Sequence, residues 1–158
     1  MIKLVAKENS PISKQEVGTL EFFLNTPKKV ASVVGVYAEQ YKEYIKDYPL
    51  YVVNPEKGKF SSVVIAKDEE SLEQFKRAKE LTGSDRFRQY GKLFGYPPTA
   101  IDYFVDAKKD RTSKFKVTYY GLGFVCERDE AGLAKVEKEL VEMYGFPLDP
   151  KYYSVTGF

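Results

Sequence analysis

Two apolar runs separated by a polar turn constrain the fold of this chain more than any other feature of its sequence. Residues 50–53 and 60–66 are rich in β-branched and aromatic side chains, and residues 54–59 between them include a proline and a glycine. Such a pattern is typical of two antiparallel strands joined by a turn. We therefore expect a β-hairpin, with Gly58 in the backbone conformation that favours glycine.

Several other segments carry apolar residues at steps of three and four, which is the spacing of one helix face. After Ser13, this spacing is kept by Val17, Leu20 and Phe23. Ser13 and Glu16 also have the spacing of a capping box, so we expect Ser13 to be the N-cap. The same reasoning predicts further helices over residues 68–81, 84–94 and 129–144 and a helix that begins at Pro97–Pro98.

The segment 28–48 supports two interpretations. Its apolar residues keep the helical spacing for about five turns. The β-branched residues from Val30 to Val36 favour a strand, because such side chains lose rotamer freedom in a helix. We expect a helix because the spacing continues to Tyr48.

These elements together predict an α+β fold. Strands are expected near residues 1–6, 50–54, 60–66 and 115–126, in a small, mainly antiparallel sheet packed by about five helices. The length of 158 residues is that of one ordinary domain. We therefore expect a single domain over residues 1–158.

The absence of histidine limits the chemistry more than any other property of the composition. It excludes Ser-His-Asp and Cys-His catalysis and histidine-ligated zinc sites within the chain. Cys126 is the only cysteine, which excludes an intrachain disulfide and a thiolate metal site. Because Cys126 follows an apolar run, we expect a buried, unreactive thiol.

Charge and hydropathy indicate whether a nucleic acid or a membrane is an expected partner. The net charge is +2, so bulk charge gives no argument for nucleic-acid binding, although a local basic patch remains compatible with it. No apolar run reaches the length of about 18 residues that a membrane span needs. We expect a cytoplasmic protein with no membrane partner, and the single cysteine favours a reducing compartment.

A junction of glycine, tyrosine and proline near the middle of the chain gathers the candidate binding residues. The helix before Gly95-Tyr96-Pro97 (the Gly-Tyr-Pro corner) is basic, and the helix after it offers free N–H groups to an anion. A second basic segment, 108–116, would extend the surface if it lies nearby. A solvated helix face and a helix-ending corner account for the same residues without a ligand. The candidate ligand-binding residues are Arg86, Arg88, Tyr90, Lys92, Tyr96, Lys109 and Arg111.

Residues 91–104, Gly-Lys-Leu-Phe-Gly-Tyr-Pro-Pro-Thr-Ala-Ile-Asp-Tyr-Phe, resemble the G-x-L-x-G-Y-P-x-C-C-x-x-x-F signature of a family of uncharacterised, largely archaeal proteins. Thr99 and Ala100 stand where that family commonly has two cysteines. If those cysteines bind a metal or do redox chemistry, the resemblance implies that this chain lacks the activity. If the motif is a structural corner, the chain keeps it. The resemblance implies no particular reaction.

Carboxylates give no metal site by themselves. Asp102 and Asp106 share a helix face, but no third ligand is identifiable. The glutamates at 137, 139 and 142 are expected on the solvated face of the last helix. We assign no catalytic residue, metal or cofactor from the sequence.

The sequence therefore favours a non-catalytic binding or adaptor protein. Its partner would be RNA or another nucleic acid, or a protein, contacted through the basic and aromatic surface around Arg86–Tyr96. The alternative is a small enzyme that acts on a phosphorylated or nucleotide ligand at the Gly-Tyr-Pro corner. A homo-oligomer that associates through its tyrosines is a third hypothesis.

Overall fold

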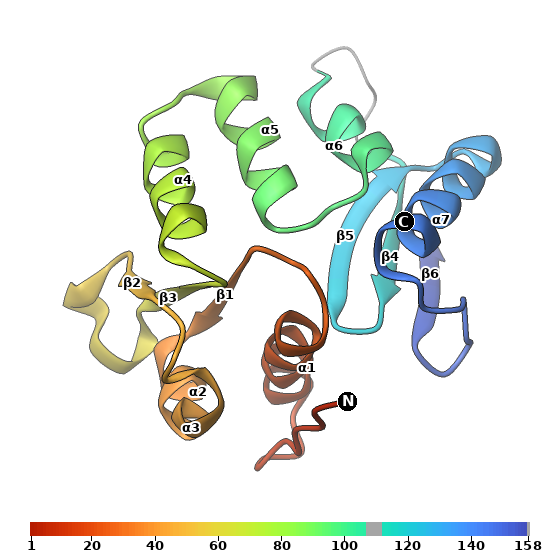
Figure 1. Cartoon of the computed structure of the whole chain (residues 1–158). Coiled ribbons are helices and arrows are strands. Elements are labelled where there is room, and N and C mark those ends of the chain that lie inside the picture. Colours follow the sequence, from red (N-terminus) through yellow and green to blue (C-terminus); the bar gives the residue numbers. More distant parts are fainter. Residues whose placement is uncertain (107–111, 158) are drawn as a thin grey trace. The chain divides into compact units, whose positions relative to one another are not determined.

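The computed structural model describes residues 1–106 and 112–157 and combines helices with two antiparallel three-stranded sheets (Figure 1). The α+β class is confirmed, although the strands form two sheets rather than one. The chain divides into two compact units, Met1–Arg77 (unit 1) and Ala78–Phe158 (unit 2), and each is described by itself. The expectation of a single domain stays a prediction.

Unit 1 is built around a sheet with the strand order β1-β3-β2. The hairpin expected over residues 50–66 is confirmed, and Gly58 has a φ of 58°. The turn of the hairpin, η1, is a 3-10 segment that is kinked at Gly58. In chain order the elements are α1 (Pro11–Asn25), β1 (Val30–Val34), α2 (Gly35–Gln40), α3 (Lys42–Ile45), β2 (Leu50–Val52), η1 (Pro55–Phe60), β3 (Ser62–Ala66) and α4 (Glu69–Lys79), which crosses into unit 2.

The prediction of one helix over residues 28–48 is wrong in its first part. Val30–Val34 is β1 and pairs with β3, with Val33 opposite Val63. Only the residues after it turn into the short helices α2 and α3. The β-branched side chains decided the outcome, because the ladder with β3 buries Val30 and Val33 almost completely.

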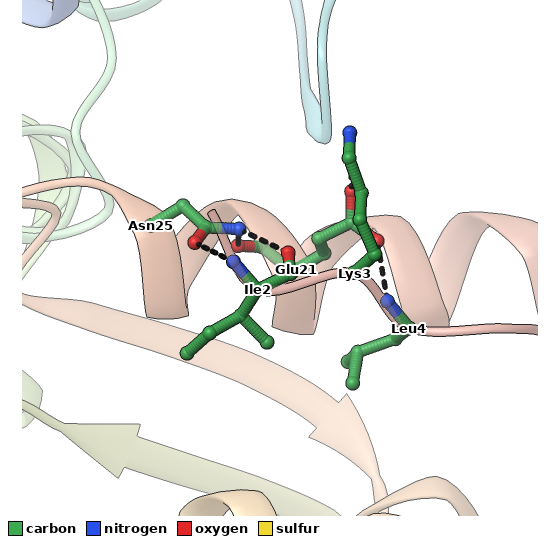
Figure 2. Close-up of polar contacts among 5 residues, drawn as sticks. All are labelled: Ile2, Lys3, Leu4, Glu21 and Asn25. Atoms are coloured by element: carbon green, nitrogen blue, oxygen red, sulfur yellow. Dashed lines mark hydrogen bonds and ion pairs between the residues drawn. The ribbon is translucent and has the colours of Figure 1, made fainter.

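The strand expected over residues 1–6 is also wrong, because none of these residues joins a ladder of the described sheets. Side chains of α1 hold the segment instead (Figure 2). The Asn25 amide accepts a hydrogen bond from the Ile2 N–H at 2.8 Å and donates one to the Ile2 carbonyl at 2.7 Å. Glu21 accepts from the Leu4 N–H at 2.8 Å. Side chains of α1 thus satisfy the N–H groups of Ile2 and Leu4 and the Ile2 carbonyl, without a neighbouring strand.

The start of α1 lies three residues before the expected one. Ser10, not Ser13, is the N-cap, and its hydroxyl accepts from the Ser13 N–H at 3.1 Å. Pro11 occupies the first helical position, which suits a residue without an N–H. The proline therefore begins the helix.

Unit 2 contains the second sheet, with the strand order β5-β4-β6. The segment 115–126, where a long strand or a kinked pair was expected, consists of two strands that form a hairpin with its turn at Tyr120–Gly121. No strand was expected after residue 126, yet the last strand pairs with β4 and completes the sheet. The elements are α5 (Gly83–Leu93), α6 (Pro98–Val105), β4 (Lys114–Tyr119), β5 (Leu122–Glu127), α7 (Glu130–Tyr144) and β6 (Tyr153–Gly157).

Helices cover one face of this sheet. Buried side chains alternate along β5, where Leu122, Phe124 and Cys126 are buried. Helices α6 and α7 contact β5 and each other, and α5 packs on α6. Figure 1 shows α5 on the side of α6 that faces away from α7. The helices therefore follow the order α7, α6, α5, whereas the sheet ends at β5.

Candidate binding site

An apolar pocket lies where α5, α6 and β5 meet in unit 2, and we call it the aromatic pocket. Its volume is about 410 Å³. Its lining includes no side chain that is charged at neutral pH, and aromatic rings supply most of it. The lining residues are Phe87, Tyr90, Gly91, Phe94, Tyr96, Ala100, Ile101, Phe104, Phe124 and Val125.

The Gly-Tyr-Pro corner sets the angle between the two helices of the pocket. Gly95 has a φ of 80°, and the Tyr96 N–H donates to the Gly91 carbonyl at 3.0 Å, as in a glycine-ended helix. Gly91 then allows α6 to approach α5 closely. A Cβ atom at Gly91 would lie only 2.7 Å from Cγ1 of Ile101. The glycines of the motif therefore have a structural role.

Two phenylalanines of the pocket are unusually accessible. Phe87 of α5 and Phe104 of α6 form an edge-to-face pair with centroids 5.2 Å apart, yet they are 47% and 41% exposed. Folding normally buries rings of this size, and contiguous exposed apolar surface marks interaction sites. The pair therefore forms an accessible apolar surface beside the pocket.

Tyr90 and Tyr96 are the two lining residues that carry a hydroxyl group, and the surroundings of Tyr96 are the better defined. The Tyr96 ring lies 6.0 Å from that of Phe124, and burial raises the pKa of its hydroxyl. Within residues 1–106 and 112–157, this hydroxyl has no hydrogen-bond partner. It stays protonated at neutral pH and can act as a hydrogen-bond donor.

Two of the basic residues of the expected surface form hydrogen bonds or an ion pair with other residues of the chain. Arg86 donates to the carbonyls of Leu81 and Lys79 at 2.7 and 2.9 Å, so that it caps the end of α4. Arg88 pairs with Asp102 at 2.6 Å and joins α5 to α6. Lys92 is exposed.

The structure thus brings only part of the expected set together. Tyr90 and Tyr96 line the pocket, whereas Arg86 and Arg88 hold helices in place. Lys109 and Arg111 lie outside the described residues. Whether a basic surface binds a ligand stays a prediction.

The start of α6 is bonded to a carboxylate of the chain itself. Glu139 of α7 accepts from the Thr99 N–H and from the Thr99 hydroxyl, both at 3.0 Å. An incoming anion would meet this carboxylate. Thr99, which replaces a cysteine of the resembled signature, therefore anchors α6 to α7.

The expectation that the glutamates of α7 are only solvated is wrong for two of them. Glu139 holds Thr99, and Glu137 accepts a hydrogen bond from the hydroxyl of Tyr153 in β6. Glu142 forms an exposed pair with Lys138 at 4.0 Å. Sequence spacing placed these residues on a helix, but it could not show what packs beside each of them.

Carboxylates of α6 and β5 and the Cys126 thiol line a second cavity of unit 2. Among the residues that the structure describes, no three His, Cys, Asp or Glu side chains gather in a possible metal site. Asp102 and Asp106 line this cavity of about 170 Å³, where Asp102 also pairs with Arg88. Cys126 is 2% exposed, and burial raises the pKa of its thiol to about 11. The expectation of a buried thiol is confirmed.

Sequence reasoning missed most of the pocket lining. Phe87, Phe124 and Val125 belong to segments whose apolar pattern also fits an ordinary core. The sequence carried one usable signal, which is the density of aromatic residues on both sides of the Gly-Tyr-Pro corner. Which of them remain exposed follows from the packing of α5 on α6.

Comparisons with protein-family models, with curated proteins and with solved structures gave no match. The resemblance to the archaeal signature therefore stays a prediction. In the described part of the chain, no helix combines the length and the apolar character that crossing a membrane requires.

Proposed function

We propose that the protein is a non-catalytic binding protein that contacts a protein partner through the aromatic pocket of unit 2. The observation that carries this proposal is the uncharged, ring-lined pocket with Phe87 and Phe104 exposed beside it. Aromatic anchors that enter such pockets dominate the energy of protein interfaces. The partner therefore contributes an apolar side chain, and Tyr96 can bond to an acceptor beside it.

Charge favours a protein partner over a nucleic acid. A phosphate backbone needs lysine or arginine side chains that can leave their hydration shell to contact it. Arg86 is bonded to carbonyls and Arg88 to Asp102. Nucleic acid would have to compete with these contacts, whereas an apolar side chain would not.

The enzyme alternative receives less support from the same contacts. A phosphate at the start of α6 would meet the Glu139 carboxylate beside Thr99. The pocket lining contains hydroxyl groups but no carboxylate, amine or thiol. General acid–base catalysis depends on a group with a pKa near the working pH. A binding role requires none.

A titration with 2-naphthol, a neutral aromatic alcohol, tests the proposal. We expect the amide resonances of the pocket residues to shift in NMR spectra, and Phe87→Glu or Phe104→Glu to weaken binding at least about tenfold by placing a charge beside the apolar site. Phe60→Glu is the matched control, because Phe60 is 64% exposed and lies in unit 1. Equal affinities of all three variants would overturn the assignment of the pocket.

Binding of a uridine oligonucleotide tests whether the partner is a nucleic acid instead of a protein. If it binds tightly, with an affinity that falls steeply with salt and with Arg88→Ala, the partner is a nucleic acid and the choice of a protein is wrong. We expect no such binding.

A further inference from the structure

We propose that the partner presents an extended peptide segment, which pairs with the free edge of β5 and places an apolar side chain in the aromatic pocket. This inference rests on the proposed function and specifies how the same site recognises its partner. It follows from the ladder of unit 2, the position of α5 and the distribution of charge.

The hairpin geometry shows which backbone groups of β5 are free. Tyr119 and Leu122 flank a two-residue turn, so they form a hydrogen-bonded pair, and such pairs alternate along an antiparallel ladder. The N–H and C=O groups of Gly123 and Val125 consequently point away from β4. Among the residues that the structure describes, they have no hydrogen-bond partner. Val125 also lines the pocket.

Two other edge strands, β1 and β6, have a charged side chain at one end. At the end of β1, the Val34 N–H donates to the Glu16 carboxylate at 3.1 Å. At the end of β6, the Arg128 guanidinium lies so close to Gly157 that a Cβ there would be 2.9 Å from its Cζ. Natural sheets protect edges with charged or covering groups because free edges recruit other strands. The β5 edge instead presents Gly123, beside which a Cβ would meet no atom within 4 Å.

The helices extend beyond the sheet on this side. Helices α6 and α7 contact β5, while α5 packs on the far side of α6 (Figure 1). The apolar face of α5 therefore lies over the position of a further strand next to β5. An added strand would direct alternate side chains towards that face. The face contributes Phe87, Tyr90 and Phe94 to the pocket.

The chemistry of the site selects an uncharged extended segment. Free N–H and C=O groups at strand spacing match another backbone, which is how β-augmentation gains affinity. The pocket lining is uncharged, and Arg88 and Asp102 neutralise each other beside it. A charged segment would lose hydration without gaining a counter-ion. Neutral apolar side chains alternating with small polar ones are therefore complementary in charge and in shape.

A blocked peptide, acetyl-Thr-Leu-Thr-Leu-Thr-amide, tests this inference without altering the protein. In the expected pairing the leucines face the pocket, and the central threonine exchanges hydrogen bonds with Val125. We expect the peptide to slow hydrogen exchange at the Gly123 and Val125 amides about tenfold or more, while the Phe124 amide, which already bonds to β4, changes little.

N-methylation of the peptide provides a matched pair. A methyl group on the central threonine nitrogen removes a donor that faces β5, and we expect affinity to fall at least about tenfold. A methyl group on a leucine nitrogen faces away from β5, so affinity should change by less than about twofold. Equal effects of the two methyl groups, or unchanged exchange at Gly123 and Val125, would overturn strand addition.

The outcome separates this inference from the proposed function. If 2-naphthol binds the pocket and the peptide does not bind, strand addition is wrong and the pocket remains a binding site. If neither binds, both proposals are wrong. Slow exchange at Gly123 and Val125 in the free protein, together with a dimeric mass by light scattering, would show that a second copy already covers the edge and would also overturn the inference.

Discussion

The two sheets have the same number of strands and the same antiparallel pairing, but they differ in how completely they are covered. In unit 1 the central strand β3 has four consecutive buried residues, Val63 to Ala66, so both of its faces are covered. In unit 2 the central strand β4 alternates between buried and accessible residues near its end, and only one face is covered. The comparison suggests that unit 1 mainly closes a core, whereas unit 2 also offers an open surface.

The apolar residues show the same contrast. In unit 1, Leu20, Phe23 and Ile65 are fully buried in one cluster. In unit 2, Phe87 and Phe104 pack on each other and remain accessible. Burial of a large side chain contributes roughly 1.5–3 kcal/mol to folding. Leaving two such rings exposed therefore forgoes stability that a bound partner can supply.

Substitution in the core of unit 1 should cost more stability than substitution in the pocket of unit 2. Ile65→Ala removes buried methyl groups from the middle of β3, and we expect it to lower the free energy of unfolding by about 3 kcal/mol. Phe104→Ala in the pocket should lower it by less than about 1 kcal/mol, because the ring is partly solvated already. Urea unfolding followed by circular dichroism measures both. Similar losses would contradict the contrast between the units.

A smaller effect is expected at the contact between α5 and α6. Gly91→Ala places a Cβ against Ile101 at 2.7 Å, and we expect a loss of about 1–2 kcal/mol after the gain in helix propensity is included. Gly123→Ala is the control, since its Cβ would enter open space. Urea unfolding of both variants measures the difference. A loss at Gly123 as large as at Gly91 would show that the close approach of the helices is unimportant.

The anchor between α6 and α7 should contribute less. Glu139→Gln removes the charge that accepts two hydrogen bonds from Thr99, and we expect a loss of about 1 kcal/mol. Glu142→Gln alters an exposed pair and should change stability by less than about 0.5 kcal/mol. Thermal unfolding compares the two variants at one pH. Equal melting temperatures would remove the structural role assigned to Thr99.

The last prediction concerns how stability changes with pH above neutrality. Buried lysines in unit 1 and a tyrosine in unit 2 should change the free energy of unfolding in opposite directions. In unit 1, burial lowers the pKa values of Lys28 and Lys67 to about 8 from 10.5. Between these values the unfolded chain binds more protons than the folded one, so unfolding should become less favourable as pH rises from 8 towards 10. In unit 2, burial raises the pKa of Tyr119 to about 12 from 10.0, so its contribution to stability falls above pH 10.

Urea titrations at intervals between pH 7 and pH 11 measure this dependence. We expect stability to rise above pH 8 and to fall again above pH 10. The double variant Lys28→Met and Lys67→Met should lose the rise and keep the fall. A rise of the same size in the double variant would assign it to other groups.

Local sequence patterns predicted correctly those helices and strands whose tertiary contacts favour the same conformation. The hairpin of β2 and β3 and the helix α7 with its Asp129 cap and Gly145 end follow from spacing and turn chemistry. The segment 28–34 did not, because valines at helical spacing also pair well in a strand, and only the presence of β3 selects the strand. The prediction of a strand over residues 1–6 was wrong for another reason. Side chains of Asn25 and Glu21 bond to this backbone in place of a neighbouring strand.

The candidate site likewise has features that follow from local sequence and features that depend on tertiary packing. The corner follows from local sequence, since Gly95 has a positive φ and Pro98 suits the start of α6, and the absence of histidine chemistry follows from composition. The other features of the site depend on tertiary packing. The bonds of Arg86 and Arg88, the exposure of Phe87 and the free edge of β5 depend on contacts between segments far apart in the chain. Local spacing is fixed by covalent geometry, whereas burial and charge pairing are fixed by whichever segment packs alongside.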